Sequence, residues 1–235
     1  MNKMIVYAHR GASEYAPENT LMSFYLGMLQ GANGIETDVR VTKDQKLILF
    51  HDGTVDRVTN STGNVEDFTY DELLQLDVIH PNLPDVVDKI PLFEDFLRLF
   101  SFRPITFAIE LKSGGIEKRV IDLLERYDMR DKTIITSFEY DYIKAVKKAD
   151  PRYRVGWLIK EHTDETLRAL SEIGAEQICP RATFVTPEYV SEMKEKGLDV
   201  RAWGVKDTDL MENCCRSKVD GMTVNFPDKL LAYLK

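Results

Sequence analysis

The chain has 235 residues, of which 31 are Lys or Arg and 39 are Asp or Glu, so its formal net charge is −8. A chain of this length can bury a sizeable core as one domain, and its acidic balance without a basic tract argues against nucleic acid as a partner. The longest apolar runs fall far short of the roughly 20 residues that span a bilayer, so we expect no membrane span.

Eight short runs rich in β-branched and apolar residues are predicted as strands. In chain order they span residues 4–8, 34–41, 105–111, 133–137, 154–159, 176–180, 199–203 and 221–224. Amphipathic helices are predicted between most of them, at residues 19–30, 116–127, 139–149, 164–173, 187–196 and 207–215. This alternation favours parallel βα units, and eight units predict a closed (β/α)8 barrel, the TIM barrel. A doubly wound open sheet is the weaker alternative.

One segment departs from the alternation. The stretch VTKDQKLILFHD is typical of a hairpin, and a turn centred near Asp44 would bring His51 back opposite Asp38. Residues 53–90 supply no barrel strand and contain Gly, Pro and Asn throughout. We expect residues 1–235 to form a single domain in which 53–90 is a capping insertion after the second strand, because long loops tend to be functional. A solvated loop without a role is the alternative.

Carboxylates recur near the ends of two predicted strands. In GIETDV, Glu36 and Asp38 are two residues apart, so in a strand both point to the same face. In AIELK, Glu110 and Lys112 share a face in the same way. A solvent-exposed polar face is one interpretation, but helices cover the outside of barrel strands, and an inward carboxylate needs a partner or a metal. Together Glu36, Asp38 and Glu110 would suit one divalent cation, Mg²⁺ or Ca²⁺.

Cationic and titratable side chains accompany these carboxylates. Arg10 and Lys112 supply positive charge for an anionic ligand, Arg through a fork of donors and Lys as a point charge. His9 and His51 each follow a predicted strand, and since histidine titrates near neutral pH, the two can act as general acid and general base. A metal, two histidines and two cations can together cleave a phosphate ester. His80, by contrast, is expected at the surface of the insertion.

A series of motifs resembles that of the glycerophosphodiester phosphodiesterase family. In order, they are HRGASEYAPENT, GIETDVRVTKD, LILFHDGTVDRVTNSTG, IPLFEDFL, AIELK and AWGVKD. The resemblance runs from residue 9 to the last predicted strand. It implies a (β/α)8 barrel with a small insertion after the second strand, and a metal-dependent phosphodiesterase that hydrolyses glycerophosphodiesters to sn-glycerol 3-phosphate and an alcohol.

The resemblance also implies roles for individual residues. The metal ligands would be Glu36, Asp38 and Glu110, and the acid/base pair would be His9 and His51. Arg10 and Lys112 would bind the phosphate, and Trp203 would form an aromatic wall of the pocket. Either histidine can be the acid, and Mg²⁺ and Ca²⁺ fit the carboxylates equally. Phe138, which follows another predicted strand, either lines this pocket or has an ordinary packing role.

Two positions depart from the family pattern. Gly204, Val205 and Lys206 follow the tryptophan where Thr and Asn are common, and Asn225 stands where an acidic residue is common. We expect neither departure to touch the metal, the histidines or the phosphate-binding pair, so they bear only on the preference for glycerol and alcohol.

Two other functions are alternatives to hydrolysis. A related barrel phospholipase would release a cyclic phosphate, and a non-catalytic barrel would only bind a phosphate ligand. Because every predicted histidine and carboxylate is present, the non-catalytic alternative is the weaker one. The head group of the substrate and the oligomeric state are not specified by any motif.

The start of the chain and its cysteines bear on the compartment. His9 follows the start too closely to leave room for a secretory signal with its basic and apolar segments. Cys179, Cys214 and Cys215 are odd in number and two are adjacent, which suits reduced thiols better than disulfides. We therefore expect a cytoplasmic protein and assign the cysteines no functional role.

Overall fold

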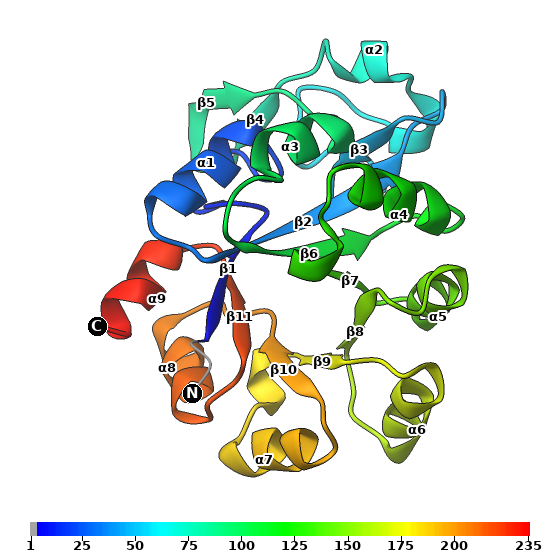
Figure 1. The fold of residues 1–235 in the computed structure, drawn as a ribbon. Coiled ribbons are helices and arrows are strands. Elements are labelled where there is room, and N and C mark those ends of the chain that lie inside the picture. The colour runs from blue at the N-terminus through cyan, green and yellow to red at the C-terminus, as the bar shows by residue number, and fades with distance from the viewer. Residues whose placement is uncertain (1–3) are drawn as a thin grey trace.

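Figure 1 shows the computed structural model of the chain, which describes residues 4–235. Eight parallel strands form a ring that is closed by the pairing of β1 with both β2 and β11. They are β1 (Ile5–His9), β2 (Gly34–Val41), β6 (Thr106–Leu111), β7 (Thr133–Ser137), β8 (Arg154–Ile159), β9 (Gln177–Pro180), β10 (Asp199–Ala202) and β11 (Gly221–Val224). The ring confirms the (β/α)8 barrel and excludes the open sheet. Each predicted strand begins and ends within one residue of its expected bounds.

Helices surround the barrel on its outer face (Figure 1). They are α1 (Leu21–Leu29), α3 (Phe93–Phe100), α4 (Glu117–Arg126), α5 (Tyr140–Ala149), α6 (Asp164–Ile173), α7 (Pro187–Glu195), α8 (Thr208–Arg216) and α9 (Pro227–Tyr233), with short 3₁₀ turns η2 (Arg130–Lys132) and η3 (Ala182–Phe184). The six predicted helices are all present, whereas α3 and α9 were not predicted. Leu92 and Phe226 stand at the N-caps of these two helices and offer no capping side chain, so the start signal of a capping residue is missing, although Pro227 opens α9. Within residues 4–235, none of the helices combines the length and apolar character needed to cross a membrane.

Aromatic side chains fill the layer between the barrel and its helices near β2 and β6. Phe24 of α1, Phe96 and Phe100 of α3, and Phe107 of β6 are fully buried. Their ring centroids lie 4.9 to 5.9 Å apart in edge-to-face and stacked pairs. This burial explains why α3 forms without a cap, because most helical stability in proteins comes from the packing of an apolar face.

The chain turns back directly after β2. β3 (Leu47–Leu49) pairs antiparallel with β2 in a register centred on Asp44, as the predicted hairpin required. In this register the backbone N–H of Phe50 donates to the carbonyl oxygen of Asp38 over 3.0 Å. His51 therefore lies one residue beyond the position predicted for it, because a turn centred on Asp44 pairs residues that are equally distant from it.

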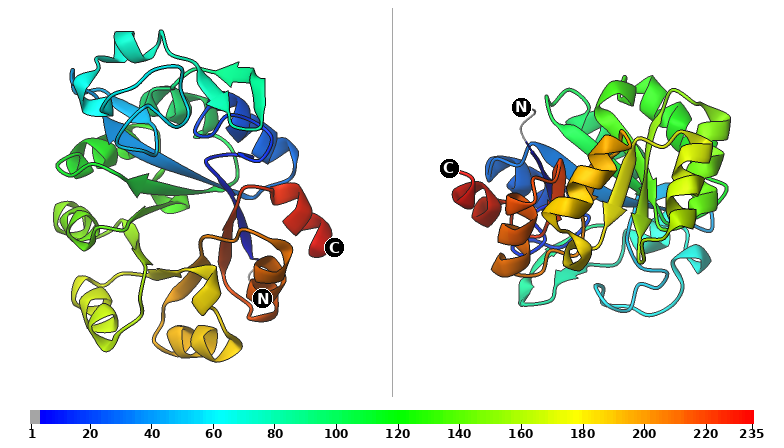
Figure 2. Two further views of the ribbon diagram at one scale, coloured as in Figure 1. Left: turned by 180° about the vertical axis from the view of Figure 1, so that it is seen from behind. Right: turned by 90° about the horizontal axis from the view of Figure 1, so that it is seen from below.

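The residues between β3 and α3 contribute no strand to the barrel. They form η1 (Val65–Asp67), α2 (Tyr70–Leu73) and a separate antiparallel pair, β4 (Val78–His80) with β5 (Leu83–Asp88). Figures 1 and 2 show these elements at one side of the barrel, beside β2 and β3. His80 was expected at the surface but is only 1% exposed. Its ring faces the loop that follows β1, where Nε2 lies 3.3 Å from the carbonyl oxygen of Ser13.

Candidate active site

The predicted site residues gather at the carboxyl ends of the barrel strands, the end that carries the site in barrels of this type. Six of them line one cavity of about 210 Å³, namely His9, Arg10, Glu36, His51, Glu110 and Trp203. The other two, Asp38 and Lys112, contact Arg10 and Glu110, respectively. We call this space the catalytic cavity.

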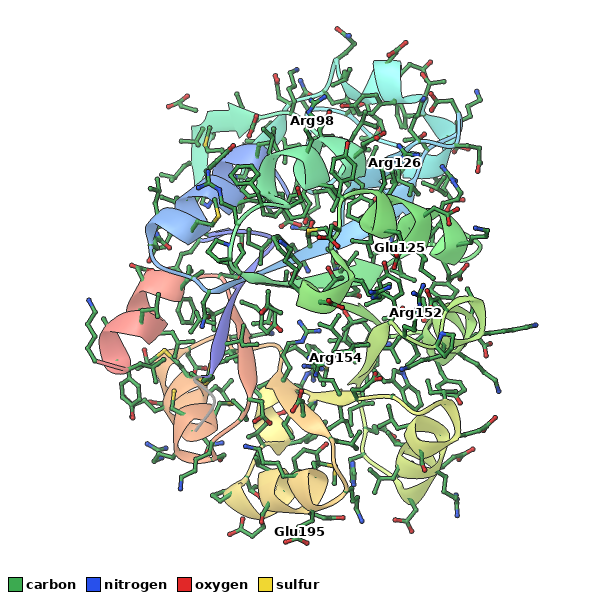
Figure 3. The ribbon with its side chains drawn as sticks, in the orientation of Figure 1. Arg98, Glu125, Arg126, Arg152, Arg154 and Glu195 are labelled. Carbon is green, nitrogen blue, oxygen red and sulfur yellow. The ribbon has the colours of Figure 1, made fainter. Side chains whose placement is uncertain are left out.

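At the opposite end of the barrel, where the strands begin, charged side chains form separate arginine–aspartate pairs. Arg154 at the start of β8 pairs with Asp199 at the start of β10, with 2.5 Å between Nη2 and Oδ2. Figure 3 shows Arg152 and Arg154 at this end, beside the start of β8. Both arginines are paired with carboxylates there, since Arg152 bonds to Asp150.

Three buried carboxylates form the centre of the site. Glu36 and Asp38 alternate with Thr37 on β2, so both point to one side of the strand. Glu110 of β6 lies opposite Asp38 in the parallel pairing. One oxygen atom of each carboxylate lies within 4.8 Å of the others. The structure therefore brings together the three residues that the sequence analysis grouped.

Positive charges lie against these carboxylates. Arg10 Nε is 3.2 Å from Asp38 Oδ2, and Lys112 Nζ is 2.5 Å from Glu110 Oε1 and 3.4 Å from Asp38 Oδ1. Asn19 also donates to Asp38 Oδ2 over 2.8 Å. Asp38 is thus the carboxylate with the most contacts to cations and donors.

A sharp turn after β1 places Arg10. Its backbone has a φ of 55°, and the following Gly11 has a φ of 84°, in the left-handed region that favours glycine. A Cβ atom at position 11 would lie 2.3 Å from Ser23 Oγ, so no larger residue fits between this turn and α1. The turn also aims the backbone N–H of Arg10 at Glu36 Oε2, 3.1 Å away.

The charge balance of the carboxylates suits a bound cation. Burial, together with repulsion by Asp38 and Glu110, raises the pKa of Glu36. Burial opposes ionisation of Asp38, but Lys112 and Arg10 hold its pKa below its usual range. Asp38 Oδ1 is buried and accepts no hydrogen bond from residues 4–235. A divalent cation would bind this oxygen, which receives no hydrogen bond, and would offset the repulsion among the carboxylates, so the three residues fit an all-oxygen metal site.

The two histidines have different partners at Nδ1. His9 Nδ1 lies 2.6 Å from Asn225 Oδ1, and its Nε2 lies 3.9 Å from Glu36 Oε2. His51 Nδ1 lies 2.6 Å from Asp52 Oδ1. The contact of Asn225 with His9 shows that the prediction about this departure was wrong. Because β11 is the neighbour of β1 in the closed barrel, a residue just after β11 reaches the histidine at the end of β1.

A series of ion pairs joins His51 to the opposite wall of the site. Asp52 Oδ2 accepts from Arg57 Nε over 2.5 Å, and Arg57 also donates to both oxygens of Glu18 over 2.7 and 2.8 Å. Glu18 accepts in addition from Arg10 over 2.8 Å. The insertion is therefore tied to the first loop of the barrel. Asp52, Arg57 and Glu18 were not predicted as site residues. All three lie inside the long motifs that resemble the family, and this position could have marked them as candidates.

Aromatic rings form another wall of the catalytic cavity. Phe138 and Trp203 pack edge to face with 5.0 Å between ring centroids, and Leu158 lies with them along the cavity. Phe138 is thus a pocket residue, which was one of its two predicted roles. Gly204 also lines the cavity, so the departure after the tryptophan reaches the pocket.

Arg201 is a cavity residue that the sequence analysis missed. It is 1% exposed and donates to Gln177 Oε1 over 3.1 Å and to Thr223 Oγ1 over 2.9 Å. These partners are neutral, so its charge adds to the positive potential around Glu36. Nothing in the run DVRAW distinguishes this arginine from a strand residue that points outward.

The chain matches the model of the glycerophosphoryl diester phosphodiesterase family over residues 9–229. It is 34% identical over 235 residues to a glycerophosphodiester phosphodiesterase of Caldanaerobacter subterraneus subsp. tengcongensis, with 97% of each chain covered. It also resembles the structure of a glycerophosphodiester phosphodiesterase from Agrobacterium tumefaciens, with 26% identity, a TM-score of 0.85, and 98% and 100% of the two chains covered. An Oleispira antarctica phosphodiesterase, solved in complex with the product sn-glycerol-3-phosphate, has 25% identity and a TM-score of 0.87 over 98% and 96% of the two chains. The chain therefore belongs to the glycerophosphoryl diester phosphodiesterase family.

Proposed function

We propose that the chain hydrolyses glycerophosphodiesters to sn-glycerol 3-phosphate and an alcohol, with one divalent cation, Mg²⁺ or Ca²⁺, as cofactor. The observation that carries the proposal is that a cluster of three carboxylates, two of which line a cavity of about 210 Å³, lies beside two histidines that line the same cavity. Membership of the family supports the reaction class. The relative from Oleispira antarctica, whose structure contains sn-glycerol-3-phosphate as product, supports the choice of product.

Five charged residues would prepare the site for a phosphate group. Glu36, Asp38 and Glu110 would hold the cation, which when bound supplies a Lewis acid for a phosphoryl oxygen. Arg10 and Lys112 would add two positive charges beside the phosphate. Both are already held by carboxylates, so little reorientation is needed when charge develops on the phosphoryl oxygens.

His9 and His51 would divide the proton transfers. One would remove a proton from the nucleophile, either water or the 2-hydroxyl of the glycerol, and the other would protonate the departing alcohol. In each histidine Nδ1 is engaged by a neighbour, Asn225 or Asp52. Nε2 is therefore the ring nitrogen left to exchange protons in the cavity, and the carboxylate behind His51 favours the orientation of that ring.

Asp52→Asn is expected to lower kcat between about 10-fold and 10⁴-fold, the range found where a carboxylate that orients a histidine is replaced. The asparagine preserves the size of the side chain but cannot supply the negative charge that fixes His51. Because Asp52 does not line the catalytic cavity, KM should change little. Steady-state measurement of glycerol 3-phosphate release would give both constants.

Asp56→Asn is the matched control for this variant. Asp56 lies in the same loop and is exposed, and its bond is to the backbone of Gly63, away from His51. We expect this control to keep the activity of the parent protein. Equal kcat values for both variants would contradict a positioning role for Asp52.

The proposed reaction is tested by its products. A coupled assay for glycerol 3-phosphate, run across several glycerophosphodiesters, should detect release from at least one of them. Phosphorus NMR of the products should then show an open monoester. A cyclic phosphate as the final product would instead indicate a lyase related to the barrel phospholipases, and phosphate binding without any turnover would indicate a non-catalytic barrel.

We further propose that residues 1–235 act as a single domain on a small-molecule substrate in the cytoplasm. The ion pairs of Arg57 with Glu18 and Asp52 support a capping role for residues 53–90 at the site. All three cysteines are free, which supports a reducing compartment. The acidic net charge supports the absence of nucleic acid among the partners.

A further inference from the structure

A second cavity opens on the other side of His9 and Arg10. Its volume is about 490 Å³, and it lies between the loop after β1 and the insertion, with Ser13 and Asn82 on its two walls. Both His9 and Arg10 also line the catalytic cavity. The two spaces therefore meet at a histidine and an arginine that would flank the phosphate. We call the second space the polar cavity.

The catalytic cavity is the smaller of the two spaces that meet at His9 and Arg10. Its volume of about 210 Å³ is below the roughly 300–1,000 Å³ of pockets that enclose drug-sized ligands. A diester has two arms, and with its phosphate beside Glu36 and Glu110 each arm can point to a different one of these two spaces. The polar cavity is the space that continues past His9 and Arg10.

The charged groups of the polar cavity are already paired with one another. Glu18 accepts from both Arg10 and Arg57, with distances of 2.7 to 2.8 Å. Glu14 is in contact with Lys229. A cationic head group would therefore have to displace an existing ion pair, and it gains little from carboxylates that are already neutralised.

Uncharged polar groups in the polar cavity keep free hydrogen-bonding capacity. The side chains of Ser13 and Asn82 make no hydrogen bond to residues 4–235, while Asn225 uses only its Oδ1, on His9. His80 holds the two walls together, because its Nε2 lies 3.3 Å from the carbonyl oxygen of Ser13 and its Nδ1 accepts from the backbone N–H of Asn82. One neutral tautomer, protonated at Nε2, satisfies both bonds. The backbone positions of Ser13 and Asn82, which carry the hydroxyl and amide groups, are thus both held by His80.

Aromatic rings offer no alternative site for a quaternary ammonium group. Within the described chain, no Phe, Tyr or Trp lines the polar cavity. In the catalytic cavity Phe138 already faces Lys112 at 5.5 Å and Lys160 at 5.7 Å, and Trp203 faces Arg181 at 5.1 Å. Recognition of choline-like groups depends on aromatic faces that are open to the cation, and at these two rings a choline group would compete with cations already in contact.

We propose that the polar cavity binds the departing alcohol of the substrate and favours neutral polyhydroxy alcohols, such as glycerol or inositol, over choline. This inference rests on the proposed function and names the substrate class for the same site. Hydroxyl groups of the alcohol would bond to Ser13 and Asn82, on the far side of His9 from the aromatic wall. The glycerol 3-phosphate arm would occupy the catalytic cavity.

The inference is tested by comparing kcat/KM for four diesters with different alcohols. They are glycerophosphoglycerol, glycerophosphoinositol, glycerophosphocholine and the methyl ester of sn-glycerol 3-phosphate, whose methyl group offers no hydroxyl to Ser13 or Asn82. The two polyhydroxy diesters should exceed the other two by about tenfold, as expected for one or two neutral hydrogen bonds. The double variant Ser13→Ala, Asn82→Leu should reduce this selectivity to about one.

Thr62→Val is the matched control, because Thr62 is an exposed residue of the same insertion whose side chain makes no hydrogen bond to residues 4–235. It should keep the selectivity of the parent protein. A preference for the choline diester, or a selectivity that the double variant leaves as it was, would overturn the inference while the proposed hydrolysis stands. Absence of glycerol 3-phosphate from all four diesters would overturn the proposed function, and the inference with it.

Discussion

The variants His9→Ala and His51→Ala are each expected to lower kcat by about 10²–10⁴, the usual contribution of one general acid or base. The double variant should show no turnover above background, since neither the nucleophile nor the departing alcohol would have a proton-transfer partner. The two side chains are 31% and 30% exposed, so their removal leaves no buried void and the fold should persist. Initial rates of glycerol 3-phosphate release and thermal melts followed by circular dichroism measure the two effects separately.

His162→Ala is the matched control for the histidine variants. His162 precedes α6 and packs against Tyr189, with 5.1 Å between ring centroids, and it does not line either cavity at the site. We expect this control to keep its kcat, although loss of the ring contact can lower its melting temperature. A double variant of His9 and His51 that remained fully active would show that the acid/base assignment is wrong.

The barrel and the meeting of its carboxylates could be predicted because both depend on short-range patterns. A spacing of two residues places Glu36 and Asp38 on one side of any strand, whatever the rest of the fold. Glu110 has the same position near the end of another parallel strand, and the carboxyl ends of parallel strands meet at one end of a barrel. The predicted proximity thus needed only the strand assignments and the order of the strands.

The partners of the two histidines depend on different kinds of information. Asp52 is the next residue after His51, whereas Asn225 is 216 positions from His9 and reaches it only through closure of the barrel. Sequence position alone suggested that Asn225 was remote. In the predicted closed barrel the first and last strands are neighbours, so the proximity of Asn225 to His9 could have been deduced as it was for the carboxylates. The individual hydrogen bond depends in addition on the register between the two strands, which no local pattern contains.

The insertion and α3 illustrate two further limits of the sequence. Arg57 and His80 lie in a segment without periodicity, so neither the ion pairs of one nor the burial of the other could be deduced from spacing. The residues Phe93, Phe96 and Phe100 do carry a helical spacing. That signal is obscured because Leu92 provides no cap and because the irregular insertion comes directly before the helix.

Removal of divalent cations is expected to abolish turnover, and addition of Mg²⁺ or Ca²⁺ should restore it. Without a cation, Glu36 and Glu110 are buried beside Asp38 and repel it, which is why burial and repulsion raise their pKa values. A cation bound at 100 times its Kd would stabilise the fold by about 2.7 kcal/mol, which for a chain of this size corresponds to a rise in Tm of roughly 5–10 °C. Dialysis against EDTA, followed by activity assays and melts with each metal, measures both effects.

The double variant Glu36→Gln, Glu110→Gln separates the metal from other causes of inactivation. It removes two of the three carboxylates, so the metal should no longer raise its Tm, and kcat should fall to background because the Lewis acid is lost. In EDTA the Tm of this variant combines relief of the repulsion between Glu36, Glu110 and Asp38 with loss of the Glu110–Lys112 ion pair, so the test reads the change in Tm on metal addition, which should be absent. Glu125→Gln, an exposed change on α4, should behave as the parent protein does in every assay. Hydrolysis by the EDTA-treated parent protein at its full rate would show that the carboxylates do not act through a metal.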